Sequence, residues 1–235
     1  MSDLQRAATS DPFVAAAEDS PVGCNRKGGT RPRSSRRRGA PYEELHGATM
    51  PIMLDATPVT AEQLLALREP GYRHEIVAGE LRRMSNAGWW HGAVAMRIGA
   101  RLQQHVESHR LGLSFAETGF VLARNPDTVR SPDAAFVRSE RLPHAPGRGH
   151  FEGAPDLAVE VTSPNDGYDD VHAKVHSWLA HGAGEVWVVA AGPRHVVVHR
   201  QDGTSMVFGE GDVLRGSCVL PEFAIAVREL FPAIG

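Results

Sequence analysis

The chain has 235 residues, with 25 basic and 28 acidic side chains, and its apolar fraction of 42% suggests that part of it is unfolded. This length predicts one domain with an appendage, or two very small domains. No run of about 18 apolar residues predicts a membrane span, and the N-terminus lacks the apolar stretch of a secretory signal. Cys24 and Cys218 are too few for a disulfide scaffold or a cysteine-based zinc site. We therefore expect a cytoplasmic location.

The basic residues are unevenly distributed. Residues 1–50 hold eight basic and six acidic side chains, which leaves a net charge of −5 for residues 51–235. Seven of the eight bases fall in residues 24–40, which contain no acid and almost no apolar side chain. Because such a segment cannot bury enough surface to offset the entropy of ordering it, residues 1–50 are predicted to be a disordered Arg-rich tail. The tail is either a basic arm that contacts phosphates non-specifically or a dispensable extension upstream of a true translation start at Met50 or Met53.

The first predicted elements of the folded part are a short helix and a hairpin. Residues 60–63 have the form of a capping box, and a short apolar helix follows them. Residues 74–84 predict a hairpin that turns at Ala78 and Gly79. In this register Glu75 and Glu80 are diagonal neighbours on one face, roughly 7–8 Å apart.

A long helix is predicted over residues 90–110, because four apolar side chains recur at every fourth position: Val94, Ile98, Leu102 and Val106. The elements expected after it are strands over 113–123 and 131–138, a loop over 139–155, a strand over 156–162, a helix over 169–181, strands over 185–191 and 195–200, and short segments over 205–208 and 218–231. This order predicts an α/β fold in which a mixed β-sheet is flanked by helices, as a single domain over residues 51–235.

Two residues break the pattern of their elements. Glu160 is an acid in the middle of a strand that otherwise reads as a continuous apolar run, which is typical of a sheet covered on both faces. Lys174 falls at the edge of the apolar face of the helix that follows. A lysine there either extends to water or meets a carboxylate, and a buried glutamate needs a cation. Taken alone, each residue also fits an ordinary solvent-exposed position.

Asp133 is a third candidate, because it follows Pro132 at the start of a predicted strand. Aspartate after proline is common turn chemistry, and the same dipeptide recurs at Pro155 and Asp156. Asp156 lies four strand residues before Glu160, roughly 13 Å away, which is too far to share a metal. Asp133 can approach Glu160 on a neighbouring strand.

An aspartate after proline, an acid on a strand and a nearby lysine together resemble the PD-(D/E)xK nuclease site. Within that superfamily, roughly residues 58–233 resemble the Uma-two family of restriction-endonuclease-like proteins. The segments that carry the resemblance are HEIVAGEL, the helix start at His91, SPDAAFV, APDLAVEVTSP, the Lys174 helix running into GAGEVWVV, and VLPEFAIAVRELF. The resemblance implies a restriction-endonuclease-like fold. The simple motif has its lysine at the position of Thr162, whereas the family's usual arrangement places it on the following helix, which fits Lys174.

The activity implied by the resemblance is metal-dependent hydrolysis of phosphodiester bonds in DNA. Asp133 and Glu160 would bind Mg²⁺ or Mn²⁺, and Lys174 would orient the attacking water and stabilise charge on phosphorus. Glu75 and Glu80 match the family's hairpin acids, and either would complete the metal shell or take a proton. His91 matches a family histidine and is assigned to nucleic-acid binding, although Gly92 stands where a glutamine often follows it. The fold class also allows a homodimer, and no membrane partner is expected.

Three other functions compete with this one. The pairs His172/His176 and His105/His109 have the spacing of zinc ligands, but no acid ligand or glutamate base sits at the required distance. A Ser-His-Asp hydrolase lacks its Gly-x-Ser-x-Gly turn. A non-catalytic module that binds nucleic acid or protein is the stronger alternative. The net charge of −5 on residues 51–235 is unusual for a DNA binder. The presence of all three of Asp133, Glu160 and Lys174 also favours an enzyme, because a binder would not need them.

Overall fold

The structure is a computed structural model that describes residues 57–163 and 166–233. The tail predicted over residues 1–50 lies outside the described residues. The described α-helices are α1 (Ala61–Ala66), α2 (Trp89–Ser108) and α3 (Tyr168–Ala180), and two 3-10 helices are η1 (Ser139–Arg141) and η2 (Val227–Leu230). None of the described helices has the length and apolar character needed to cross a membrane.

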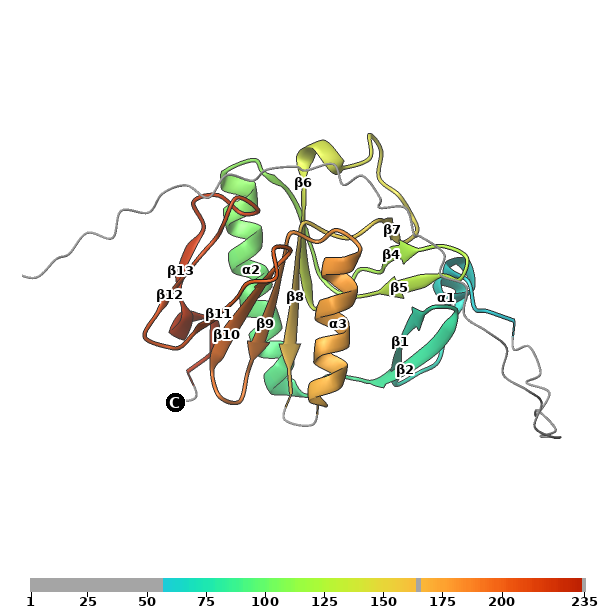
Figure 1. The fold of residues 1–235 in the computed structure, drawn as a ribbon, viewed down its shortest axis with the longest axis horizontal. Helices are drawn as coiled ribbons and strands as arrows, with labels where there is room; N and C mark the ends of the chain where they lie inside the picture. Colours follow the sequence, from blue (N-terminus) through green and yellow to red (C-terminus); the bar gives the residue numbers. More distant parts are fainter. Residues whose placement is uncertain (1–56, 164–165, 234–235) are drawn as a thin grey trace, which may run out of the picture. The chain divides into compact units, whose positions relative to one another are not determined.

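The strands form three sheets (Figure 1). A five-stranded sheet has the order β2 (Glu80–Ser85), β1 (Tyr72–Val77), β5 (Thr128–Arg130), β4 (Phe120–Ala123) and β7 (Phe151–Glu152). A six-stranded sheet has the order β11 (Ser205–Phe208), β10 (His195–Arg200), β9 (Glu185–Ala190), β8 (Leu157–Thr162), β6 (Ala134–Arg138) and β3 (Gly112–Phe115). Strands β12 (Val213–Arg215) and β13 (Ala224–Ala226) pair separately. Both larger sheets are mixed, since β8 runs parallel to β9 and β4 runs parallel to β7.

The first two predicted elements, the short capped helix and the hairpin, are confirmed. The capping box that begins α1 is present, with the Thr60 hydroxyl accepting from the Gln63 backbone and the Gln63 side chain accepting from the Thr60 backbone. The hairpin turns at Ala78 and Gly79, whose φ angles of 51° and 83° both lie in the left-handed region. Its register pairs Glu75 with Arg82, as the two-residue turn requires.

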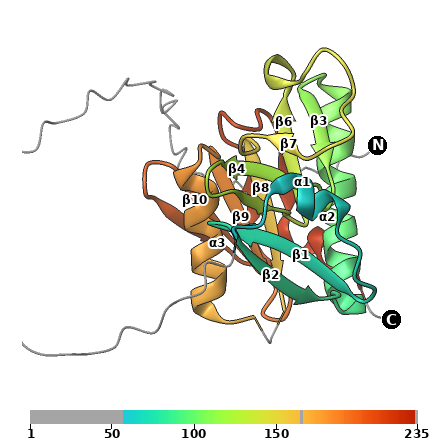
Figure 2. The ribbon, with the colours of Figure 1, turned by 90° about the vertical axis from the view of Figure 1, so that its right-hand side faces the viewer.

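Helices cover both faces of the six-stranded sheet. The four apolar side chains that recur along α2 are at most 1% exposed, and they join a core with Leu157, Val159 and Val161 of β8. The other face of β8 presents Ala158 to a second core that includes Val175 and Trp178 of α3. Figure 2 shows α2 and α3 on opposite sides of the sheet. Strand β8 is therefore buried on both faces, as its near-continuous apolar sequence predicts.

Two predictions about the strands were wrong. The strand predicted over residues 113–123 is two strands, β3 and β4, which lie in different sheets. The chain leaves the extended conformation between them at Glu117, whose φ is 48°. Strand β5 was not predicted at all, because its three residues directly follow the turn at residues 125–127. As a result, a single mixed sheet was expected where the described residues form two large mixed sheets and a two-stranded one.

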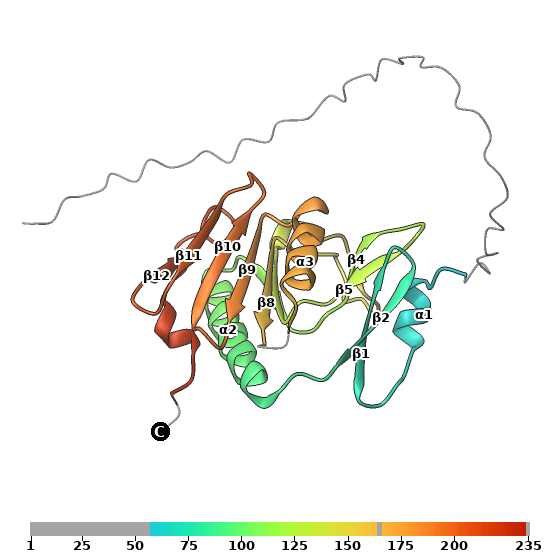
Figure 3. The ribbon, with the colours of Figure 1, turned by 60° about the horizontal axis from the view of Figure 1, so that its bottom comes forward.

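This topology brings distant parts of the sequence to β8. Strand β6 pairs antiparallel with β8 from Ala134 opposite Val159, so the residue before β6 lies beside the second half of β8. Strand β1 pairs with β5 at Ile76 and Val129 in the neighbouring sheet. Figure 3 shows α3 between β8 and these strands. The region around the second half of β8 therefore receives side chains from both sheets and from both long helices.

Candidate active site

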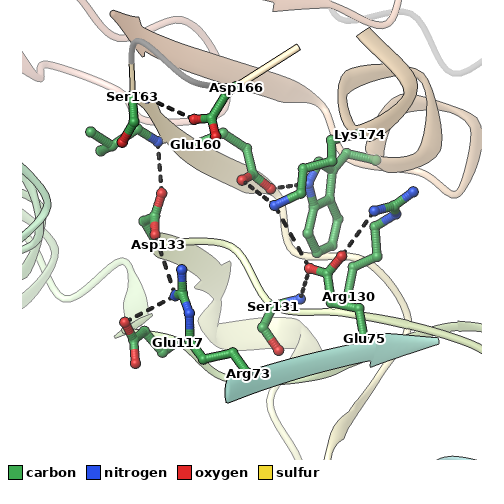
Figure 4. Close-up of polar contacts among 12 residues, drawn as sticks. Arg73, Glu75, Glu117, Arg130, Ser131, Asp133, Glu160, Ser163, Asp166 and Lys174 are labelled. Atoms are coloured by element: carbon green, nitrogen blue, oxygen red, sulfur yellow. Dashed lines mark hydrogen bonds and ion pairs between the residues drawn. The ribbon is translucent and has the colours of Figure 1, made fainter. Parts of the chain in front are cut away.

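Buried Glu160 and half-buried Lys174 form an ion pair. Glu160 lies in the middle of β8 and is 5% exposed. Its Oε2 accepts from Lys174 Nζ at 3.0 Å, and its Oε1 accepts from the Trp178 indole at 2.8 Å (Figure 4). Lys174 and Trp178 stand one turn apart on α3, so the helix presents two donors to one carboxylate. The lysine that breaks the apolar face of α3 therefore meets a carboxylate, which is one of the two outcomes that its position allowed.

Glu75 lies on the other side of the same ammonium. Its Oε1 is 3.8 Å from Lys174 Nζ and also accepts from the backbone amide of Ser131 at 3.0 Å. Its Oε2 accepts from Arg130 Nη1 at 2.9 Å. Glu75 is 1% exposed, and it thus connects β1 and β5 to the lysine of α3.

Asp133 completes the cluster from the start of β6. Its backbone amide donates to Val159, and its Oδ2 accepts from the Val161 amide at 2.7 Å, so it is bonded to the residues on both sides of Glu160. Its Oδ1 is 2.9 Å from His91 Nε2 and 3.8 Å from Arg73 Nη1. The chain therefore brings Asp133, Glu160, Lys174 and Glu75 to one region, which we call the carboxylate cluster.

The imidazole of His91 comes from the first turn of α2. It is 11% exposed, and its Nδ1 lies 3.4 Å from the hydroxyl of Ser163, at the end of β8. Its nearer contact is with Asp133, so in this structure the histidine holds a carboxylate in place. Its predicted contact with nucleic acid stays a prediction.

The electrostatics of the cluster follow from burial and from neighbouring charges. Burial raises the pKa of the Glu160 carboxyl, and the Lys174 charge only partly opposes this. Burial of Lys174 works to lower the pKa of its ammonium, but Glu160 and Glu75 outweigh it and the pKa is raised. For Asp133, burial works to raise the pKa, while His91 and the Val161 amide bring it below the ordinary value. The hydrogen bond with Asp133 raises the pKa of His91.

The structure does not bring Glu80 to the cluster. Its side chain is 71% exposed at the turn of the hairpin and accepts from Arg82 at 2.7 Å. The register that makes Glu75 and Glu80 diagonal neighbours is confirmed, but only Glu75 is covered by α3, because Glu80 lies on the edge strand. Asp156, set aside on distance, accepts from Arg141 and the Arg138 amide.

Two arginines of the site were not predicted. Arg73 lies two residues before Glu75 on β1. Because side chains two positions apart on a strand point to the same face, this spacing is the signal that could have found it. Arg130 lies on β5, the strand that was not predicted, so its pairing with Glu75 had no readable signal. Trp178 is fully buried on the apolar face of α3, and its indole also donates to Glu160.

The carboxylate cluster suits a hard divalent cation by its chemistry. In residues 57–163 and 166–233, no three His, Cys, Asp or Glu side chains are grouped so that they surround one ion. Mg²⁺ does not need such a cage, because it commonly takes one or two carboxylates and completes its shell with water and substrate phosphates. Asp133 and Glu160 offer that pair of ligands.

The chain was compared with known proteins. Residues 61–228 match the model of the Uma2 family, described as "Putative restriction endonuclease". A crystal structure of a "putative nuclease belonging to DUF820" from Anabaena variabilis ATCC 29413 is similar, with a TM-score of 0.64 and 22% identity over 74% of this chain and 98% of the other. Comparison with curated proteins found no match. The predicted restriction-endonuclease-like fold is confirmed, and the chain belongs to the Uma2 family.

Proposed function

We propose that this protein is a metal-dependent endonuclease that hydrolyses phosphodiester bonds in DNA. The observation that carries this proposal is the meeting of Asp133, Glu160 and Lys174 around strand β8, in a chain whose family is described as "Putative restriction endonuclease". Its DNA substrate, its metal, a cytoplasmic location and a homodimer stay predictions.

Each residue of the cluster has a role in this proposal. Asp133 and Glu160 would hold Mg²⁺ or Mn²⁺, which polarises a phosphate oxygen and lowers the pKa of a bound water. Lys174 orients the attacking water and stabilises negative charge that develops on the phosphate. Glu75 positions Lys174, since its own carboxylate is held by Arg130 and Ser131. His91 positions Asp133.

The test is a cleavage assay on single-stranded, duplex and branched DNA with Mg²⁺, with Mn²⁺ and with a chelator. We expect metal-dependent cleavage that Asp133→Ala and Glu160→Ala abolish. Asp202→Ala is the control, because Asp202 is an acid in the turn between β10 and β11. Cleavage that both cluster substitutions leave intact would contradict the proposal.

A non-catalytic module that binds nucleic acid or protein is the second candidate, and one observation favours it. Both oxygens of Glu75, Asp133 and Glu160 already accept hydrogen bonds or lie at hydrogen-bonding distance of a donor in the chain. A purely structural cluster would have the same contacts. Calorimetric titration with Mg²⁺ or Mn²⁺ separates the two functions. An enzyme binds the ion, and Asp133→Ala or Glu160→Ala abolishes that binding, whereas a binder that has lost catalysis binds no ion at these carboxylates.

A further inference from the structure

A pocket of about 650 Å³ lies beside the carboxylate cluster. One wall is a side of α3, and the other is formed by Val77 of β1 together with Thr128 and Arg130 of β5. This volume is within the range of about 300–1,000 Å³ that small-molecule sites occupy. The proposed hydrolysis does not use this pocket.

Strand alternation explains why the pocket and the cluster share one wall. Ile76 pairs with Val129, and both side chains are fully buried on one face of the sheet. Glu75 and Val77 therefore point to the other face of β1, as Thr128 and Arg130 do on β5. Glu75 lies at the cluster, and Val77 lines the pocket.

Small side chains on α3 form the opposite wall. Ala173, Ser177 and Ala180 recur every three or four residues and all line the pocket. Lys174 directly follows Ala173, so the helix that closes the pocket also supplies the ammonium of the cluster. Arg130 lines the pocket and donates to Glu75, the carboxylate that faces Lys174 (Figure 4). A ligand in the pocket would thus lie beside Arg130, which is itself bonded to Glu75 of the cluster.

The side chains at the pocket suit a planar ring with polar edges. Tyr168 begins α3 and is 80% exposed, with its ring stacked on the His172 imidazole at a centroid distance of 5.9 Å. An aromatic face of this kind stacks on nucleobases of any sequence. The imidazoles of His172 and His176 and the hydroxyl of Ser177 offer donors and acceptors to the edge of a base.

We propose that this pocket holds an unpaired nucleobase of the substrate strand, close to the phosphodiester that reaches Asp133 and Glu160. This inference rests on the proposed function. A base that is paired and stacked in a duplex cannot enter, so the preferred substrate has an unpaired or extruded nucleotide beside the cleaved bond. Residues 51–235 carry a net charge of −5, which weakens attraction to phosphates, and stacking on a base supplies affinity without added positive charge.

The test measures binding by fluorescence anisotropy, with the full chain in EDTA so that no DNA is cut. Three duplexes of one sequence are compared. The first is fully paired, the second carries one unpaired nucleotide, and the third has an abasic site in place of that nucleotide. We expect the unpaired nucleotide to bind most tightly. Tyr168→Ala should lower that affinity roughly 5- to 150-fold, to the abasic level, and Tyr168→Phe should keep it.

Two further variants make this test specific. Ala173→Leu puts a larger side chain into the pocket from an exposed helical position, so it should block the unpaired base without unfolding the chain. Tyr72→Ala is the matched control, because Tyr72 is also exposed but lies on β1 outside the pocket lining. It should leave all three affinities unchanged.

The proposal is overturned by equal affinity for the three duplexes, by no binding to any of them, or by Tyr168→Ala weakening all three alike. A deoxynucleoside monophosphate that competes as well as the unpaired strand would assign the pocket to free nucleotides instead. Cleavage of the same duplexes with Mg²⁺ separates the two proposals. Absence of cleavage contradicts the proposed function, whereas cleavage without preference for the unpaired nucleotide contradicts only the base pocket.

Discussion

Each carboxylate of the cluster is paired with a donor from a different element. Lys174 of α3 pairs with Glu160, Arg130 of β5 pairs with Glu75, and His91 of α2 pairs with Asp133. A buried charge without a partner is far more costly than a paired one, so these contacts stabilise the cluster only as a set. Losing one member should therefore affect both stability and activity.

Glu75 and Glu80 give a matched pair of substitutions on one hairpin. Glu75→Gln leaves Arg130 without its carboxylate, so we expect the free energy of unfolding to fall by about 3 kcal/mol and cleavage to fall roughly 100-fold as Lys174 shifts. Glu80→Gln should change the free energy by less than about 0.5 kcal/mol and leave cleavage unchanged. Urea denaturation and the cleavage assay measure the two quantities. Equal effects of the two substitutions would show that the hairpin acids are not distinguished by burial.

At the scale of elements, α3 combines three surfaces on 13 residues. Val175 and Trp178 pack in the core, Lys174 enters the cluster, and Ala173 and Ser177 line the pocket. The helix must keep one rotation about its axis to serve all three. Its fixed core face therefore determines where the lysine and the pocket lie.

The hairpin that carries Glu75 has a turn that can be improved. Ala78 adopts a φ of 51°, a conformation that costs residues with a Cβ about 1–2 kcal/mol, and Asn tolerates it better than Ala. We expect Ala78→Asn to raise the free energy of unfolding by about 0.5–1 kcal/mol, as measured by urea denaturation.

A substitution at the neighbouring turn residue, Gly79, serves as the control for Ala78→Asn. Gly79→Ala should lower stability, because Gly79 has a φ of 83° and an added Cβ would lie 2.6 Å from Pro58 Cβ. If Ala78→Asn destabilised the chain, the turn would not have the geometry described.

At the scale of the whole molecule, histidines affect stability in opposite directions as pH changes. Burial lowers the pKa of His150, so the folded state disfavours its charged form. The hydrogen bond with Asp133 raises the pKa of His91, so the folded state favours its charged form. Protonation of His150 therefore opposes folding and protonation of His91 supports it.

His150→Gln isolates the first of these effects. As pH falls through the ordinary histidine pKa of 6.5, the unfolded chain takes up a proton at His150 before the folded chain does, and stability is lost. We expect the wild-type chain to lose more stability than His150→Gln between about pH 7.5 and 5.5, measured by urea denaturation at each pH. Parallel pH profiles would show that His150 titrates alike in both states.

Much of the fold could be predicted because its signals are local. The apolar repeat of α2, the capping box of α1, and the hairpin turn each need only a few adjacent residues, and all three are confirmed. The break at Glu117 and strand β5 were missed because short strands are determined by their partners in the sheet.

The sequence by itself determined the family, the mixed α/β fold and the residues that conflict with their surroundings, because an acid in an apolar strand and a lysine on an apolar helix face are visible without coordinates. Only the tertiary structure decided which charges meet. Glu75 and Glu80 are alike as hairpin acids, but α3 covers only Glu75. The Arg130 partner and the pocket also come from the pairing of β1 with β5, which brings together residues 55 positions apart. Such contacts depend on packing between elements, which local sequence patterns do not specify.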